Sequence, residues 1–269
     1  MAEKSLREKY GEWGIVLGAT EGVGEAFCKK LAEGGMNLVM VGRREELMRE
    51  KAEHFKQEYG VDYKVVRADL SDPDDACAKI FAATEGLDMG FMSYVACLHH
   101  FGRFQNTELE DHFKLVNVNV ISILRIFHHY MKEFAAKDRG AVINVSSMTG
   151  ISSSPFNAEY GAGKAYILKL TEAVACECEG TGVDVEVCTL GTTKTPSAMR
   201  NLPGGEEGAK VVALAQTPDE VADEAFAKLG THLSIITGER NKKSVRDWKA
   251  NHTEDEYIRY MGSFFTDRQ

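Results

Sequence analysis

The sequence of 269 residues predicts an α/β protein: a doubly wound parallel sheet of about seven strands, followed by an aromatic C-terminal extension. Short apolar runs alternate with longer amphipathic runs, which is typical of parallel strands covered by helices on both faces. The first apolar run leads into a glycine-rich turn, and no repeat or low-complexity linker divides the chain. We therefore expect a single domain over residues 1–269, with a core at 1–238 and an extension at 239–269.

Each predicted strand is a continuous apolar run, because strands of a covered parallel sheet are buried on both faces. In chain order the strands are expected at Gly14–Leu17, Asn37–Val41, Tyr63–Arg67, Phe91–Ala96, Ala141–Val145, Asp184–Cys188 and Ser234–Thr237. The predicted helices are longer, and their apolar residues recur at helical spacing. They are expected at Gly22–Glu33, Arg44–Tyr59, Asp72–Thr84, Glu108–Phe134, Ala158–Glu179 and Pro218–Leu229.

Composition excludes several classes of protein. Hydrophobic residues make up 43% of the chain and charged residues 27%, so it can bury a sizeable core and is not wholly disordered. The net charge of −9 argues against a nucleic-acid partner and against an anionic membrane surface. No apolar stretch approaches the roughly 20 residues of a membrane span.

The N-terminus and the cysteines predict the compartment. Residues 1–10 are charged throughout, unlike a signal peptide. The six cysteines form no CxxC pair and predict reduced thiols, so we expect a cytoplasmic protein. The eight histidines lack metal-ligand spacing, and we expect no metal site.

A glycine-rich turn follows the first strand and precedes a helix. Gly18 permits the tight turn, while Gly22 and Gly24 let the backbone and the helix approach a pyrophosphate at the positive helix N-terminus. Three glycines alone are a weak signal. Their place between a strand and a helix predicts a dinucleotide site.

The end of the second strand indicates which dinucleotide binds. An acidic residue there would accept from the ribose of NAD, but the chain has Gly42, Arg43 and Arg44 instead. Guanidinium groups match the geometry of a 2′-phosphate, so NADP(H) is favoured. The alternative is that both arginines merely begin a solvated helix. Asp69, after the third strand, is either an acceptor for the adenine amino group or an ordinary turn acid.

Three residues form a candidate catalytic cluster. Tyr160 and Lys164 are four residues apart in a predicted helix, which puts them on one face. A tyrosine titrates near pKa 10, and an adjacent ammonium favours its phenolate. Ser147 follows the fifth strand, where its hydroxyl can hydrogen-bond a carbonyl or alcohol oxygen while the tyrosine exchanges its proton.

With these motifs the sequence resembles the short-chain dehydrogenases/reductases over nearly the whole chain, to about Gly238. The glycine turn is similar to the family's TGxxxGxG motif, with Leu17 in place of the threonine. The segment Gly191–Thr195 is similar to PGxxxT, with Leu190 in place of the proline. The family's NNAG motif is changed to Tyr94–Cys97, which makes the local contacts there uncertain but leaves the catalytic positions intact.

The resemblance implies a Rossmann-type fold and assigns site residues. Asn119 corresponds to the asparagine that holds a proton-relay water, whereas Asn117 is expected on a different helical face. The implied catalytic residues are Asn119, Ser147, Tyr160 and Lys164. The implied cofactor-binding residues are Gly18, Thr20, Glu21, Gly22, Val23, Gly24, Arg43, Arg44, Asp69, Leu70, Tyr160, Lys164, Thr193 and Thr195.

Further segments are similar to a bacterial, NADP-dependent group within this family that interconverts 7-oxo and 7β-hydroxy bile acids, such as 7-oxolithocholate and ursodeoxycholate. These segments are Leu6–Gly14, Tyr94–Leu98, Ser146–Pro155, Gly191–Thr193 and Asp247–Gly262. This resemblance implies a bile acid or related steroid as substrate. It also implies a homo-oligomer, with a dimer favoured and a tetramer as the alternative.

The substrate pocket is expected between Met148–Asn157, Ser197–Gly205 and the residues Leu98 and His99. Lys194 and Arg200 are candidates to bind the bile-acid carboxylate, although loop cations are usually just solvated. Aromatic residues crowd the last thirty or so positions, including Trp248, Tyr257, Tyr260, Phe264 and Phe265. They are expected either to pack on the chain's own surface or to dock on a partner subunit beside the substrate site.

Two other functions stay open at this stage. A reductase for another steroid position or another ketone would carry the same catalytic residues. A non-catalytic NADP-binding regulator would usually lack the tyrosine or the lysine, both of which are present here as Tyr160 and Lys164.

Overall fold

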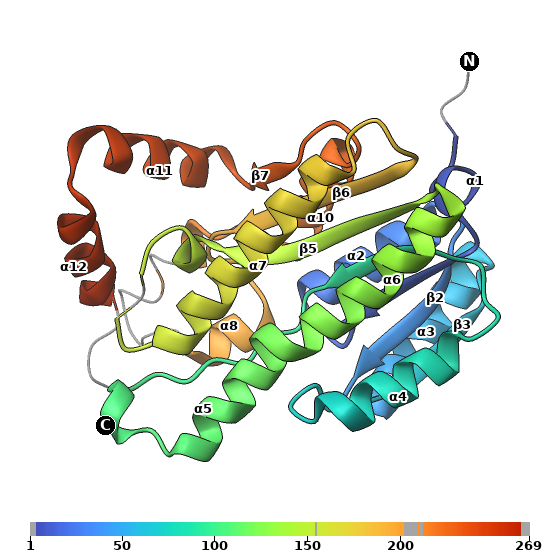
Figure 1. Cartoon of the computed structure of the whole chain (residues 1–269), viewed down its shortest axis with the longest axis horizontal. Coiled ribbons are helices and arrows are strands. Elements are labelled where there is room, and N and C mark those ends of the chain that lie inside the picture. Colours follow the sequence, from blue (N-terminus) through green and yellow to red (C-terminus); the bar gives the residue numbers. More distant parts are fainter. Residues whose placement is uncertain (1–3, 154, 202–208, 210–211, 265–269) are drawn as a thin grey trace.

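A computed structural model describes residues 4–153, 155–201, 209 and 212–264. Seven parallel strands form one sheet in the order β3-β2-β1-β4-β5-β6-β7 (Figure 1). This order confirms the predicted doubly wound sheet, because the chain proceeds outward from β1 in one direction and then from β4 in the other. The strands are β1 (Trp13–Leu17), β2 (Asn37–Gly42), β3 (Tyr63–Arg67), β4 (Met89–Tyr94), β5 (Gly140–Ser147), β6 (Val183–Leu190) and β7 (Ser234–Ile236).

Helices cover both faces of the sheet (Figure 1). Helices α2, α3 and α10 pack on one face, and α4, α6 and α7 pack on the other. The helices are α1 (Leu6–Tyr10), α2 (Val23–Glu33), α3 (Glu45–Tyr59), α4 (Pro73–Thr84), α5 (Leu109–Val116), α6 (Ile123–Lys137), α7 (Ala158–Glu177), α8 (Pro196–Asn201), α10 (Pro218–Lys228), α11 (Glu239–Asn251) and α12 (Glu254–Phe264).

Apolar side chains from both helical layers hold the sheet in place. Phe27 of α2 and Phe91 of β4 lie on one face, while Phe127 and Phe134 of α6 lie on the other, and each is nearly or fully buried. Burying a side chain of this size stabilises the fold by about 1.5–3 kcal/mol. The sheet is therefore a rigid platform whose carboxyl edge carries the predicted functional residues.

The prediction of one continuous helix over residues 108–134 is wrong. The structure has α5, a π-helical segment η2 (Asn117–Ser122), and then α6, which ends at Lys137. Two buried side chains fix η2: the Tyr94 hydroxyl donates to the Val118 carbonyl at 2.6 Å, and the Ser122 hydroxyl donates to the Leu70 carbonyl at 2.7 Å. π-Helical turns occur often at functional sites and leave no clear periodicity in a sequence.

Helices α11 and α12 form what we call the C-terminal arm (residues 239–264), which lies at the left of Figure 1. Within the arm the Trp248 ring stacks on Tyr257 and Tyr260, with ring centroids 5.1 and 4.5 Å apart. The arm also contacts the chain's own segment before α7, where the Ser152 hydroxyl donates to Glu254 at 3.3 Å. The described part of the aromatic tail thus packs on its own chain, which was one of the two expectations. Phe265 lies outside the described residues.

All six cysteines fall in the described part of the chain and are free thiols. None of the helices described here has the length and apolar character needed to cross a membrane.

Candidate active site

The predicted site residues gather at the carboxyl edge of the sheet. They come from the turn after β1, the ends of β2, β3, β5 and β6, the segment η2 and the helix α7. Ligand sites of doubly wound sheets form at this edge, where the strand order reverses. The topology thus brings together residues that lie far apart in the sequence.

The glycine turn is packed too tightly to hold side chains. Gly18 and Gly22 have positive φ angles of 92° and 63°. A Cβ added to Gly24 would lie 2.1 Å from the Gly18 carbonyl oxygen, and one added to Gly22 would lie 2.7 Å from Thr195 Cγ2. The turn therefore offers bare backbone at the start of α2, as binding of a pyrophosphate requires.

The end of β2 carries no side chain at Gly42 and leads directly into two cations. A Cβ added to Gly42 would lie only 2.6 Å from the Thr20 hydroxyl oxygen, so the backbone packs against Thr20 too closely to hold a side chain. Arg43 and Arg44 follow directly, and Arg44 pairs with Glu21 at 2.8 Å. No carboxylate stands at the end of β2 itself, and this donor set fits a 2′-phosphate.

Asp69 has a structural role in the turn after β3. Its carboxylate accepts from the Ser71 backbone and hydroxyl at 3.0 and 2.9 Å. Burial raises the pKa of Asp69, but the bonds from Ser71 and the charge of Arg43 outweigh it and hold the pKa below its usual value. Asp69 is thus a turn acid, and its contact with adenine stays a prediction.

The three central residues of the catalytic cluster meet between β5 and α7. Ser147 lies close enough to Tyr160 to lower the pKa of its hydroxyl, and the Lys164 ammonium lies 5.8 Å from the centroid of the Tyr160 ring. Lys164 is only 2% exposed, and its ammonium donates to the Val145 carbonyl at 2.8 Å. An ammonium has three donors, so this bond leaves capacity for a ligand.

Burial is the largest influence on the pKa values of Tyr160 and Lys164. It raises the pKa of Tyr160, and the nearby Cys97 adds to this effect, while the bond with Ser147 opposes it. Burial also lowers the pKa of Lys164. Burial and Cys97 set the direction of the Tyr160 shift, and the expectation that Lys164 lowers the pKa of Tyr160 stays a prediction.

Asn119 and Asn117 have different surroundings, as expected. The Asn119 amide is fully buried and makes two bonds to the backbone of Leu98: its nitrogen donates to the carbonyl at 2.7 Å, and its oxygen accepts from the N–H at 3.0 Å. Asn117 instead donates to the Ser71 carbonyl. Asn119 therefore holds the segment after β4 against η2, beside α7, where a Cβ added to Gly163 would lie 2.6 Å from the Asn119 Cβ.

The remaining predicted residues line the same edge. Thr193 is 6% exposed, and Thr195 caps α8 by accepting from the Ala198 N–H at 3.0 Å. Val23 is buried at the start of α2, and Leu70 is buried where its carbonyl meets Ser122.

The structure places two residues that were expected around the substrate pocket. The His99 ring lies 6.0 Å from the Tyr160 ring, and burial together with the charges of Lys164 and His100 lowers the pKa of His99. The side chain of Arg200, a candidate for binding a carboxylate, pairs with Glu21 at 2.7 Å. Part of the predicted pocket, residues 154 and 202–205, lies outside the described residues.

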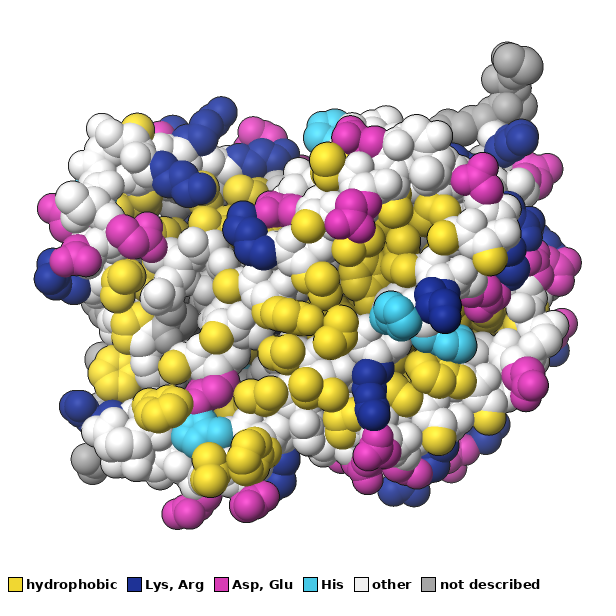
Figure 2. Space-filling view, viewed as in Figure 1, with side chains coloured by type: hydrophobic (Ala, Val, Ile, Leu, Met, Phe, Trp, Pro, Cys, Tyr) yellow, Lys and Arg dark blue, Asp and Glu magenta, His cyan; other side chains and the backbone are white. Residues whose placement is uncertain are grey.

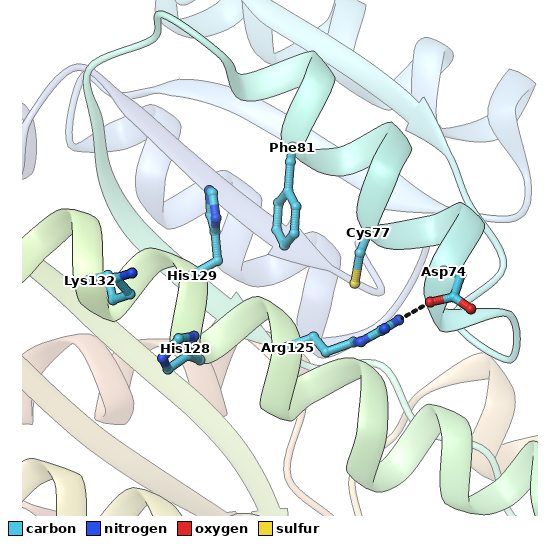
Figure 3. A pocket seen from close by; sticks show the side chains of 7 residues that line it. All are labelled: Asp74, Cys77, Phe81, Arg125, His128, His129 and Lys132. Atoms are coloured by element: carbon cyan, nitrogen blue, oxygen red, sulfur yellow. Dashed lines mark hydrogen bonds and ion pairs between the residues drawn. The ribbon is translucent and has the colours of Figure 1, made fainter.

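A separate pocket opens between α4 and α6, away from the strand ends (Figure 3). Phe81 stacks on His129 there, with ring centroids 3.9 Å apart, and Arg125 pairs with Asp74 at 2.5 Å. None of the predicted site residues lines this pocket. Among the residues that the structure describes, no group of His, Cys, Asp or Glu is placed to hold a metal.

Comparison with known proteins identifies the class. The profile of the short chain dehydrogenase family matches residues 12–206, and the chain belongs to this family of oxidoreductases, whose Rossmann fold binds NAD or NADP. The chain is 70% identical to the 7beta-hydroxysteroid dehydrogenase of Collinsella aerofaciens over 98% of its own length and 100% of that protein. It is also 70% identical to the enzyme of the same name from Mediterraneibacter gnavus, over 97% of this chain and 99% of that protein.

A solved structure gives the same result. A 7beta-hydroxysteroid dehydrogenase studied for its stereoselectivity superimposes with a TM-score of 0.92 at 70% identity, covering 96% of this chain and 99% of that one. The similarity therefore extends beyond the family profile and includes residues of the C-terminal arm.

Proposed function

We propose that this protein is an NADP(H)-dependent oxidoreductase that interconverts 7-oxo and 7β-hydroxy bile acids. The observation that carries the proposal is the 70% identity to 7beta-hydroxysteroid dehydrogenases over almost the whole chain. The cluster of Ser147, Tyr160 and Lys164 at the carboxyl edge supports it, because these groups suit reduction of a ketone.

Four residues are proposed to select NADP(H). Gly42 keeps the backbone close to the Thr20 hydroxyl, and Arg43 and Arg44 supply forked donors for the 2′-phosphate. The bare backbone at Gly22 receives the pyrophosphate at the N-terminus of α2, where the helix dipole favours an anion.

Ser147 and Tyr160 act on the substrate oxygen. When bound, the reduced nicotinamide supplies a hydride to C7. The two hydroxyls hydrogen-bond the 7-oxo oxygen, and Tyr160 gives that oxygen its proton as the alcohol forms. Because burial raises its pKa, the Tyr160 hydroxyl stays protonated at neutral pH, as a proton donor requires. Oxidation of the 7β-alcohol is the reverse.

Lys164 and Asn119 support this proton transfer. The Lys164 ammonium stabilises the phenolate that remains after Tyr160 has lost its proton, and it holds the nicotinamide ribose. Asn119 fixes the segment after β4 and supports the water chain that returns a proton to the site. Most of the barrier lowering comes from positioning and from preorganised donors.

The steroid is proposed to lie between the segment before α7, the segment that contains α8, and Leu98 with His99. The C-terminal arm borders the first of these segments, through the bond between Ser152 and Glu254 and the close approach of Gly262 to Pro155. An apolar cleft with few polar anchors suits a steroid nucleus.

Oxidation of epimeric alcohols tests this proposal. The protein is incubated with NADP⁺ and either ursodeoxycholate or its 7α epimer, and formation of NADPH is followed by absorbance. We expect rapid oxidation of the 7β-alcohol and little of the 7α-alcohol. Rapid oxidation of the 7α epimer, or of a steroid at another position only, would contradict the proposal.

We further propose a homodimer, with a tetramer as the alternative. Figure 2 shows apolar side chains gathered over α6 and α7, and a groove there is lined by Leu124, Phe127, Met131, Leu170 and Val174 among others. Apolar surface of this kind favours association. Light scattering at several concentrations gives the mass; a monomer at all concentrations would contradict this proposal.

A further inference from the structure

Glu21 forms a bridge between two cations from distant parts of the chain. One carboxylate oxygen lies 2.8 Å from Arg44 and the other lies 2.7 Å from Arg200. The Glu21 side chain is only 18% exposed, whereas both arginines are about half exposed or more. Burial raises the pKa of Glu21, but the bonds and charges of the two arginines outweigh it and lower the pKa, so the carboxylate is charged.

The fold fixes this bridge from three sides. Glu21 lies in the glycine turn after β1, Arg44 begins the segment after β2, and Arg200 lies in α8. The same turn touches the start of α8, because the space beside Gly22 is filled by Thr195. Since Thr195 also caps α8, the helix is held where Arg200 reaches Glu21.

The bridge presents an electrostatic conflict at the proposed phosphate site. Arg44 is one of the two cations expected to bind the 2′-phosphate, yet it already pairs with a carboxylate. An uncompensated carboxylate next to a bound phosphate would repel it and would compete for Arg44. Arg200, which lies 179 residues after Glu21 in the chain, supplies the positive charge that compensates the Glu21 carboxylate.

We propose that Arg200 is a specificity-determining residue for NADP(H) that acts through Glu21, an inference that rests on the proposed use of NADP(H). By neutralising Glu21, Arg200 leaves Arg44 available to the 2′-phosphate. NAD(H) has no 2′-phosphate, so its binding does not depend on this compensation. Arg200 is thus a positioning residue for charge and contacts neither the nicotinamide nor the reacting atoms.

A double-mutant cycle with both nucleotides tests this inference. Dissociation constants for NADPH and NADH are measured by fluorescence titration at low salt for the wild type, Arg200→Gln, Glu21→Gln and the double variant. An ion pair whose arginine is largely exposed changes an equilibrium only a few-fold. We therefore expect Arg200→Gln to weaken NADPH binding by about three- to fivefold and NADH binding by less than about twofold. The double variant should bind NADPH as tightly as Glu21→Gln alone.

A matched control removes a guanidinium elsewhere. Arg125→Gln breaks an ion pair with the exposed Asp74, between α6 and α4, and it should change neither constant. The preference of Arg200→Gln for NADPH should also approach that of the wild type at high salt, where exposed charges are screened.

Two results would overturn this inference without contradicting the proposed cofactor. Equal losses for NADPH and NADH in Arg200→Gln would mean that Arg200 merely docks α8. A double variant as weak as Arg200→Gln would mean that Glu21 is not the group through which Arg200 acts. A wild-type protein that binds NADH as tightly as NADPH would instead contradict the proposed cofactor, and the inference with it.

Discussion

The carboxyl edge of the sheet and the C-terminal arm are held by different kinds of contact. At the edge, Asn119 and Lys164 are almost fully buried and bond to backbone groups of Leu98 and Val145. In the described part of the arm, by contrast, the buried side chains are Val245 and Tyr257, and its aromatic rings stack mainly on one another.

This difference suggests that the carboxyl edge carries out the chemical step and that the C-terminal arm influences which substrate binds. Groups that exchange a proton must be positioned to within a fraction of an ångström, and a buried network bonded to the sheet provides that precision. An arm with few contacts to the core can change its sequence without disturbing that network. We therefore expect substitutions at the edge to reduce turnover or cofactor binding, and substitutions in the arm to alter substrate binding.

Removing the Tyr160 hydroxyl should have the largest effect. Tyr160→Phe eliminates the proton donor, so we expect kcat to fall by about 10²–10⁴-fold while the dissociation constant for NADPH changes little. Tyr166→Phe on the same helix is the matched control and should retain full activity. Turnover of Tyr160→Phe near that of the wild type would remove Tyr160 from the mechanism.

The arginines after β2 should have the next largest effect. Replacing both Arg43 and Arg44 by Gln should weaken NADPH binding by about tenfold or more, because charge-assisted bonds to the phosphate are lost, with little change for NADH. Arg49→Gln, which breaks a pair with Glu45 one turn further on, is the control. If both nucleotides weaken alike, the edge does not select the 2′-phosphate.

The residues at the carboxyl edge could be predicted from the sequence more easily than the position of the C-terminal arm. Gly18, Gly22 and Gly24, and the spacing of Tyr160 and Lys164, are local patterns that lie within one turn or one helix. The bridge from Glu21 to Arg200, the π-helical turn beside Asn119, and the place of the arm depend on contacts between distant segments. A single sequence carries no pattern for such contacts, so composition could indicate an aromatic tail but not its location.

A change in the arm should affect the substrate more than the cofactor. Trp248→Ala removes the ring that stacks on Tyr257 and Tyr260, and such pairs contribute about 0.5–1.5 kcal/mol each. We expect KM for the steroid to rise several-fold while NADPH binding is unchanged. Trp248→Phe should restore most of the loss; an unchanged KM in Trp248→Ala would separate the arm from the substrate site.

The smallest expected effect concerns stability and pH. Glu186 in β6 is fully buried, and burial, with a contribution from Glu224 opposed by Lys228, raises its pKa from 4.5 to about 8. The unfolded chain loses this proton at lower pH than the folded chain, so stability falls as pH rises from about 4.5 to 8.

Glu186→Gln keeps the side chain neutral and removes this loss. The variant should melt several degrees higher than the wild type near pH 8, and the advantage should vanish below pH 4.5. Thermal unfolding across this range measures the difference. An advantage that is constant with pH would show that packing, not ionisation, is responsible.

Reduction of 7-oxolithocholate tests the central claim most directly. The protein is incubated with this ketone and either NADPH or NADH, and the configuration at C7 of the product is determined by NMR. The account predicts the 7β-alcohol, ursodeoxycholate, formed much faster with NADPH. A 7α-alcohol, an unreacted ketone, or equal rates with both nucleotides would contradict it.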